Sequence, residues 1–513
     1  MNKKRMIINL AASLVSFAVS MGISFFLTPY LTEVLGTEAY GYIGLANNFV
    51  NYASIVTVAL NSMAGRFITI EIHKGNSKKA DEYFNSILLS NVFLSVVISF
   101  ISLIIIFNIQ SLLKVSDRLV RDVQITFAVA FLNSVFTVVT AVFTVAPFAR
   151  NRLDVQSIRT ILGNIVKLVV TLGLIACLTP KIYFISIGVL ACSVFMAGAD
   201  IFLTKKMLPE VNINFRHFHF QAVKEVLSAG IWNSVNSLSY ALLLGLDLLI
   251  ANLFIGETAM GMLSIAKTFP TALQSLIAAI SGIFIPQFTI LYAKGQQKEL
   301  VSSVKYSIKV LSLIMTVPIA GLVVFGTDFY QLWLPGKSAA EIQIIQLLSV
   351  ISLLPKMVSA YVDSLYSINT VTNHLKVPVL VNMVLGILNV GLVFLLLRTT
   401  KLGVFAIAIG NAIMLFLKTV LFVPSYAASN LKQRGFVFYP PFIRAVICSI
   451  VIILLFMGLK NLFVINSWGD LMAAAGICGA LGFLINFIIL LNREERKETL
   501  AKIKNKICSV SER

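Results

Sequence analysis

Long apolar runs separated by short polar connections fill almost the whole chain. A run of roughly 18 or more apolar residues is long enough for a helix to cross the hydrocarbon core of a bilayer. About fourteen such runs are present, which predicts an all-α polytopic membrane protein. They lie near residues 7–30, 41–64, 83–107, 123–147, 156–178, 182–203, 228–254, 259–286, 305–326, 341–363, 377–397, 403–425, 442–463 and 468–491. The connections are too short for a separate soluble domain.

The chain contains an internal repeat at an offset of 220 residues. Without a gap, residues 36–78 and 256–298 match at 11 of 43 positions, where chance gives roughly three. The copies end in the pentapeptides KGNSK and KGQQK, which begin at Lys74 and Lys294. Six spans fit in the offset, and six is even. Both copies therefore have the same orientation, which predicts a parallel repeat about an axis along the membrane normal.

The repeat divides the chain into two pseudo-symmetric six-helix lobes and an appendix. The predicted N-terminal lobe covers residues 1–210, and the predicted C-terminal lobe covers residues 211–430. Residues 431–492 hold the last two transmembrane helices, and residues 493–513 form a basic cytoplasmic tail.

Polar residues follow one helix face in four of the spans, at spacings of three and four. The span 7–30 carries Ser13, Ser16 and Ser20; 41–64 carries Gly44, Asn47, Asn51, Ser54, Val58 and Asn61; 228–254 carries Asn233, Asn236 and Tyr240; 259–286 carries Ser264, Lys267, Thr271, Gln274, Ala278 and Ser281. Lipid offers polar groups no partner, so these stripes line a central cavity or contact neighbouring helices. We favour the cavity because the stripes run through most of the membrane depth.

The basic residues are distributed unevenly between the two sides of the membrane. The chain has a formal net charge of +19 but only 12% charged residues. About 28 of the 41 Lys and Arg residues fall in the termini and the connections on one side, and about 8 fall on the other. This bias predicts a multi-pass membrane protein with both termini in the cytoplasm. The basic face then meets anionic membrane lipids and no nucleic acid.

Several charged residues lie inside the apolar runs, where charges are functional candidates by default. The cations are Arg159, Lys167, Lys267, Lys356 and Lys418, and the deepest acid is Asp247. Arg159, Asp200 and Asp363 lie near helix ends, and we expect them to snorkel to the surface. Asp247 and Lys267 are each ten residues from Glu257 in the connecting turn, so they lie at one depth and can meet. An excess of cations suits an anionic headgroup.

Signals for enzymatic or metal chemistry are weak. The five Cys residues form no CxxC pair, and His217-x-His219 is too little for a metal site. The segment GKS at residues 336–338 lacks the first glycine of a phosphate-binding loop, because Gln331 stands there. We therefore predict no metal, no cofactor and no catalytic site. Membrane potential, Na⁺ and H⁺ remain open as the energy source.

Together these residues resemble a known family. The resemblance rests on the fourteen spans, the two halves and the runs ISFFLTPYLTEVLGTEAYGYIGLANNF, GRFITIEIHKGN and GLDLLIANLFIGETAMGMLSIAKTF. They are similar to the polysaccharide-transporter branch of the multidrug/oligosaccharidyl-lipid/polysaccharide exporter superfamily, and within it to capsule and O-antigen repeat-unit flippases. The resemblance implies a V-shaped two-lobed transporter of the bacterial cell membrane, with a central cavity and alternating access. The implied cargo is an oligosaccharide on a polyprenyl diphosphate, moved from the cytoplasmic to the outer leaflet for cell-surface polysaccharide assembly.

The resemblance also implies roles for residues. In related lipid II flippases, arginines near the cavity engage the diphosphate, and Arg66 and Lys267 stand where such cations are expected. The predicted substrate site comprises Asn47, Asn51, Ser54, Arg66, Asn233, Asn236, Lys267, Thr271, Gln274 and Lys356, with Asp247 as the coupling candidate. A polysaccharide polymerase or export machinery is a further expected partner.

Three alternatives remain open. The first is a lipid II or spore-wall precursor flippase, although the first span has no internal arginine. The second is a drug or cation antiporter of the same superfamily, which would want acids in the cavity, where only Asp247 is deep. The third is a membrane-embedded sugar polymerase, which would want acid and base residues near a large outer loop that the chain lacks.

Overall fold

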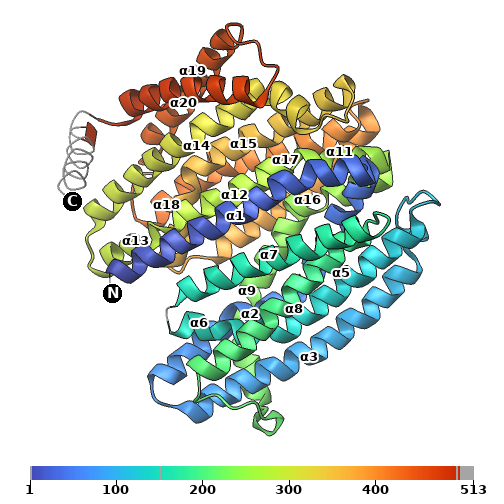
Figure 1. The fold of residues 1–513 in the computed structure, drawn as a ribbon. Coiled ribbons are helices and arrows are strands. Elements are labelled where there is room, and N and C mark those ends of the chain that lie inside the picture. Colours follow the sequence, from blue (N-terminus) through green and yellow to red (C-terminus); the bar gives the residue numbers. More distant parts are fainter. Residues whose placement is uncertain (1–2, 151, 493–494, 497–513) are drawn as a thin grey trace, which may run out of the picture. The chain divides into compact units, whose positions relative to one another are not determined.

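The computed structural model describes residues 3–150, 152–492 and 495–496, and for residues 3–14 and 153 it describes the backbone alone. Every regular element in this part of the chain is helical (Figure 1). Thirteen helices are long and apolar enough to cross a membrane, or 14 if the pair Phe220–Gly245 and Asp247–Ile255, bent by 41°, is one span. The predicted all-α polytopic fold is thus confirmed. The predicted basic tail lies outside the described residues except for Glu495 and Arg496.

The elements follow one another with short connections. The first half contains α1 (Lys3–Leu35), α2 (Thr37–His73), α3 (Ser77–Phe107), α4 (Ile109–Leu112), α5 (Val120–Thr140), η1 (Ala141–Thr144), α6 (Val145–Ala149), α7 (Leu153–Cys177) and α8 (Tyr183–Met207). The middle contains η2 (Phe215–His217), α9 (Phe220–Tyr240), η3 (Ala241–Gly245), α10 (Asp247–Ile250), η4 (Ala251–Ile255), α11 (Glu257–Ala266), α12 (Thr268–Gly282) and α13 (Ile285–Ala293). The rest contains α14 (Gln297–Trp333), α15 (Ala339–Val371), α16 (Lys376–Thr399), α17 (Val404–Leu417), η5 (Lys418–Phe422), α18 (Val423–Asn430), α19 (Tyr439–Lys460) and α20 (Trp468–Leu490).

The repeated pentapeptides form the same helix-ending turn twice. Gly75 and Gly295 adopt φ angles of 75° and 68°, a left-handed conformation that glycine takes without steric cost. The amide that follows each glycine donates to the carbonyl five residues earlier, from Asn76 to Glu71 and from Gln296 to Leu291. This is the glycine-based end of a helix. KGNSK and KGQQK recur because each must end one span and start the next within a few residues.

The chain folds into two compact units. Unit 1 comprises Met1–Ile265 and Lys376–Gly410, and unit 2 comprises Ala266–Leu375 and Asn411–Arg513. The units group residues by proximity, whereas the predicted lobes follow the sequence repeat. The lobe boundaries at residues 210 and 430, the V shape and the central cavity therefore stay predictions.

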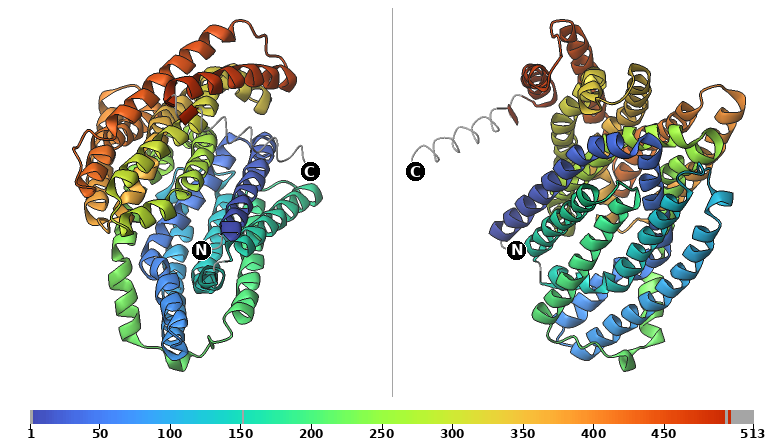
Figure 2. Two further views of the ribbon diagram at one scale, coloured as in Figure 1. Left: turned by 90° about the vertical axis from the view of Figure 1, so that its left-hand side faces the viewer. Right: turned by 45° about the vertical axis from the view of Figure 1, so that its right-hand side comes forward.

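Unit 1 is built from helices that pack both on sequence neighbours and on helices far away in the chain. α3 packs on α5, α5 on α8, and α8 on α7, and Figures 1 and 2 show these four helices side by side. α1 packs on α7, and α9 packs on both α2 and α16. A cluster of buried apolar side chains joins α2, α3, α6 and α9, and it includes Ile68, Phe84, Ala146 and Val226.

Unit 2 is organised around α14. This helix packs on α15, α19 and α20, and α15 also packs on α12 and α18. Ser307 on α14 shares a buried hydrogen bond with Ser364 on α15, at 2.7 Å between the hydroxyl oxygens. The last two helices thus attach to unit 2 through α14, as an addition to the repeated part.

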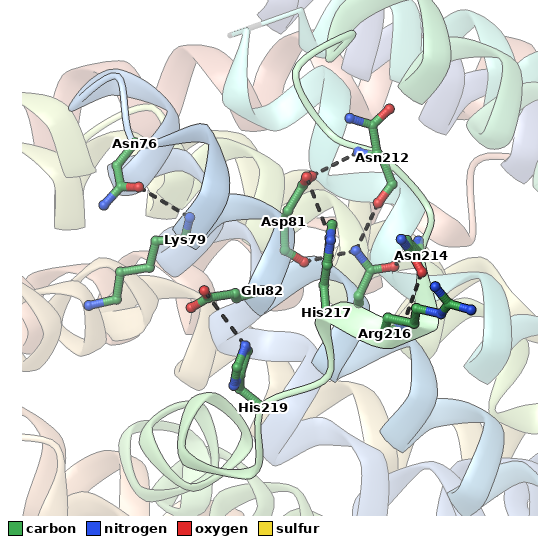
Figure 3. A network of polar contacts seen from close by, with 10 residues as sticks. Asn76, Lys79, Asp81, Glu82, Asn212, Asn214, Arg216, His217 and His219 are labelled. Atoms are coloured by element: carbon green, nitrogen blue, oxygen red, sulfur yellow. Dashed lines mark hydrogen bonds and ion pairs between the residues drawn. The ribbon is translucent and has the colours of Figure 1, made fainter.

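The connection between α8 and α9 is fixed to the start of α3 (Figure 3). The Asp81 carboxylate accepts from the Asn212 amide at 2.8 Å, and Asn85 bonds the Asn212 carbonyl and the Asn214 amide, each at 2.8 Å. The Ser86 hydroxyl accepts from the His219 amide at 2.9 Å. Buried polar side chains thus satisfy the backbone of this connection. As a result, α9 stays attached to the first half of the chain, and unit 1 extends beyond residue 210.

Equivalent residues of the two repeat copies meet within unit 1. The Thr258 hydroxyl donates to the carboxylate of Glu38, 220 residues earlier, at 2.9 Å. A Cβ on Gly41 would lie 2.9 Å from the Cα of Gly261, which is also 220 residues away. A residue touches its own copy only near a two-fold axis. Small residues let α2 and α11 approach this closely.

Candidate functional site

A cluster of charged and polar side chains lies inside the spans of unit 2. Lys356 on α15 donates a short hydrogen bond from Nζ to the side-chain carbonyl of Gln274 on α12. Both residues belong to the predicted substrate site. The sequence placed them on separate polar faces, and packing of α12 on α15 brings these faces together.

Asp363 and Lys418 complete the cluster. Asp363 lies seven residues after Lys356 on α15, which is two turns along the same helix face. Its charge attracts both Lys356 and Lys418, and the two lysines repel each other. Lys418 is 2% exposed, and its ammonium lies 4.9 Å from the ring centroid of Tyr366. Two lysines and one aspartate thus act on one another inside the membrane spans, where charge is costly.

Lys418 was not among the predicted site residues, although it was recognised as a cation inside an apolar run. It starts η5, a π-helical segment inside a membrane span. Such segments interrupt the regular ladder and are frequent at functional sites. Neither the π-helical turn nor the partners of Lys418 can be read from the apolar pattern.

Lys267 stands where the helix of its span is interrupted. It lies between α11 and α12, half-buried, and its carbonyl accepts from the amide of Thr271 at 3.0 Å. The charge of Lys267 repels Lys356, so the two ammonium groups act on one region of unit 2. Thr271 is exposed, and Gln274 is half-buried, one turn further along α12.

Polar residues on α9 hydrogen-bond to neighbouring helices of unit 1. The Asn233 amide donates to the Ser62 hydroxyl on α2 at 3.0 Å. Asn236 accepts from the side-chain amide of Asn382 on α16 at 3.2 Å. These contacts favour the packing alternative for this stripe. A role in lining a cavity stays a prediction for both residues.

On α2 the predicted site residues face outward from unit 1. Asn47 and Asn51 are exposed, as is Arg66 nearer the predicted inner end. Ser54 is half-buried and donates to the carbonyl of Asn51 at 2.7 Å. Of the polar stripe on α1, the side chain of Ser13 lies outside the described residues.

Arg159 and Asp200 do not snorkel to the surface as expected. They are 8% and 4% exposed, and they form a short ion pair between α7 and α8. Each lies about 20 residues from Thr179 in the connection between these helices, so both sit at one depth. Counting residues from the connecting turn, as for Asp247 and Lys267, predicts that these two residues meet. Buried charges in proteins are paired, and each of these two residues supplies the partner of the other.

Asp247 is buried in unit 1, with 3% exposure. Its carboxylate accepts from the amide of Leu248 at 2.8 Å. The residue lies between the π-helical segments η3 and η4, at the bend of its span. Lys267 belongs to unit 2, so the predicted meeting of these two residues stays a prediction.

The arrangement suits binding of an anion. Charge-assisted hydrogen bonds from ammonium groups to phosphate are among the strong polar contacts in proteins. Among the described residues, no group of three or more His, Cys, Asp or Glu side chains could hold a metal ion.

Comparison with known proteins assigns the chain to a family. Residues 7–292 match the family described as "Polysaccharide biosynthesis protein". The chain is 29% identical over 497 residues to the "Uncharacterized membrane protein EpsK" of Bacillus subtilis (strain 168), covering 97% of this chain and 98% of that protein.

Solved structures share the fold. The lipid II flippase MurJ in an inward closed conformation aligns with a TM-score of 0.70 and 14% identity, over 94% of this chain and 98% of that one. An inward-facing multidrug resistance MATE transporter of the MOP superfamily aligns with a TM-score of 0.63 and 16% identity, over 83% and 98%. The chain is therefore a multi-pass membrane protein of the polysaccharide biosynthesis protein family, and its fold resembles those of the lipid II flippase MurJ and the MATE transporter.

Proposed function

We propose that this protein is a flippase that moves a polyprenyl-diphosphate-linked oligosaccharide repeat unit from the cytoplasmic to the outer leaflet by alternating access. The product would serve assembly of a cell-surface polysaccharide such as a capsule. The family match supports a role in polysaccharide biosynthesis. The observation that carries the proposal is the cluster of Lys356, Lys418 and Asp363 inside the spans of unit 2.

The chemistry of the cargo fits this cluster. A sugar–diphosphate headgroup cannot cross hydrocarbon unaided, because its polar groups would lose their hydration. Lys356 and Lys267, with Arg66 from α2, would hold the diphosphate as charge-assisted partners. Amide and hydroxyl groups would replace water around the sugars. The proposed sugar-binding residues are Asn47, Asn51, Ser54, Asn233, Asn236, Thr271 and Gln274.

The membrane potential favours the proposed direction. An inside-negative potential drives negative charge outward by about 2.3 kcal/mol per charge per 100 mV. Movement of Na⁺ or H⁺ during transport would change this driving free energy. Partners would include the lipid-linked oligosaccharide, the surrounding lipids and a polymerase or export machinery that consumes the product.

A charge-swap experiment tests a coupling role for Asp247 and Lys267. We propose that the diphosphate competes with Asp247 for Lys267, so that the pair opens when cargo binds. Transport should then stay impaired in the double variant Asp247→Lys with Lys267→Asp, because the swap moves the cation to another helix. Recovery of transport in the swap would mean a purely structural ion pair. Full activity of Lys267→Ala, at a normal protein level, would remove Lys267 from the mechanism.

Deletion of the gene, followed by leaflet-resolved analysis of lipid-linked oligosaccharides, tests the function itself. We expect the intermediate to accumulate on the cytoplasmic side and to reach the outer leaflet when the wild-type chain is restored. Accumulation of lipid II instead would identify the chain as a lipid II or spore-wall precursor flippase. An unchanged distribution of both lipids would refute the proposal.

A further inference from the structure

A pocket in unit 1 is lined by none of the polar-stripe residues and by none of the clustered lysines. Its volume is about 420 Å³, and its walls come from the end of the α9–η4 span and from α16 with the connection that follows. Phe254, Phe394, Arg398 and Lys401 are among the lining residues. Both spans end here at the side predicted to face out of the cell, so the pocket sits where the outer leaflet meets water.

Two cations on the pocket have no acidic partner. In the described part of the chain, neither Arg398 nor Lys401 forms an ion pair, although Arg118, Lys181 and Lys460 on the same predicted side do. Arg398 and Lys401 are both exposed. Two uncompensated cations on one small cavity raise the local concentration of anions.

Part of the pocket wall is apolar. The rings of Phe254 and Phe394 meet edge to face, with centroids 4.9 Å apart and an interplanar angle of 80°. Phe254 remains 53% exposed. A free inorganic anion would contact the cations and would make no contact with this aromatic wall. A lipid phosphate would use both, with its chain against the rings and its headgroup at the rim.

Arg398 also lies in the last turn of α16, where the helix dipole favours a cation. The helix dipole is equivalent to about half an elementary negative charge at this end of the helix. It accounts for one cation in the last turn, and it accounts for neither Lys401 in the connection nor the adjoining aromatic wall.

We propose that this pocket binds the phosphate of a lipid in the outer leaflet through Arg398 and Lys401, with the hydrocarbon chain lying on Phe254 and Phe394. The lipid is either a phospholipid or a polyprenyl diphosphate, which share this chemistry. The proposal concerns binding alone and does not depend on flippase activity, so failure of one leaves the other standing.

Native mass spectrometry of the full-length protein in detergent tests the proposal. The probes are phosphatidylglycerol, undecaprenyl diphosphate and inorganic pyrophosphate, each titrated separately. We expect the double variant Arg398→Gln with Lys401→Gln to bind at least one of the two lipids about tenfold more weakly than wild type, the loss equivalent to one charge-assisted hydrogen bond.

The matched control is Lys114→Gln with Arg121→Gln, which removes two exposed cations on the same predicted side that do not line the pocket. Equal loss in both double variants, or no loss in the pocket variant at normal thermal stability, would overturn the proposal. So would pyrophosphate binding as tightly as either lipid. If both lipids bind, competition between them at the pocket supports a shared site, and the lipid with the larger loss identifies the natural source.

Discussion

Two groups of charged residues inside the spans, one in each unit, differ in how their charges are balanced. In unit 1, Arg159 on α7 is matched one to one by Asp200 on α8. In unit 2, the carboxylate of Asp363 attracts both Lys356 and Lys418, and the two lysines repel each other. A matched pair neutralises two charges and fastens two helices together. A cluster with more cations than acids keeps a net positive charge, and this charge attracts an anion that arrives from outside. The contrast predicts a structural role for the matched pair and a role in binding cargo for the cluster.

Breaking the matched pair should have the largest effect on stability. Arg159→Leu leaves Asp200 buried without its partner, which costs about 3–5 kcal/mol. We expect a lower melting temperature and less protein in the membrane. Adding Asp200→Leu should restore both, because the unpaired charge is gone. A double variant as unstable as the single one would contradict a structural role for the pair.

Neutralising the cluster should instead affect transport. In Lys356→Gln or Lys418→Gln, Asp363 keeps the other lysine, so the protein should remain stable. Transport per molecule should fall at least about tenfold, because a charge-assisted contact is worth roughly 1.5–3 kcal/mol. Appearance of the lipid-linked oligosaccharide in the outer leaflet is the readout. Lys181→Gln, which removes a cation paired with Asp122, is the control. Equal transport in all three variants would mean that the cluster does not act on cargo.

The close contact of α9 with α2 makes a third prediction. A Cβ on Gly230 would lie 1.9 Å from the carbonyl oxygen of Ala59, whereas one on Gly198 would meet nothing within 4 Å. Gly230→Ala should destabilise the protein by about 1–3 kcal/mol through overpacking. Gly198→Ala should stabilise it by roughly 0.5–1 kcal/mol, since alanine suits a helix better than glycine. Opposite signs in thermal unfolding confirm the contact, and equal shifts contradict it.

The smallest expected effect concerns the stripe on α9. Asn233→Ala and Ser62→Ala each remove the same hydrogen bond, so each should cost about 1 kcal/mol of stability. If Asn233 also binds sugar, as proposed, its loss lowers transport per folded molecule and the loss of Ser62 does not. Equal transport in the two variants would assign Asn233 to helix packing alone.

The sequence predicted the spans and the duplicated turns because both follow from local rules. Apolar length decides which segments cross the membrane, and a glycine with positive φ decides where Lys74 and Lys294 end their helices. The contact of Thr258 with Glu38 follows from the repeat as well, once the copies are related by a two-fold axis. These features need no knowledge of which helices pack together.

The partners of the site residues can be predicted only when it is known which helices pack together. Packing of α12 on α15 decides that Gln274 bonds Lys356, and periodicity within one helix says nothing about its neighbour. Arg159 with Asp200 is the exception, because equal depth in one helical hairpin predicts their meeting. Lys418 was missed because its partners come from α15, far away in the sequence.

Reconstitution tests the central claim most directly. Purified protein in liposomes that contain the lipid-linked oligosaccharide would be assayed for movement of the headgroup across the bilayer, detected by a sugar-cleaving enzyme added outside. The wild type and Arg159→Leu with Asp200→Leu should both move the headgroup, whereas Lys356→Gln should move it at least about tenfold more slowly. Movement by that lysine variant at the wild-type rate, or no movement by a folded wild-type protein, would contradict the account.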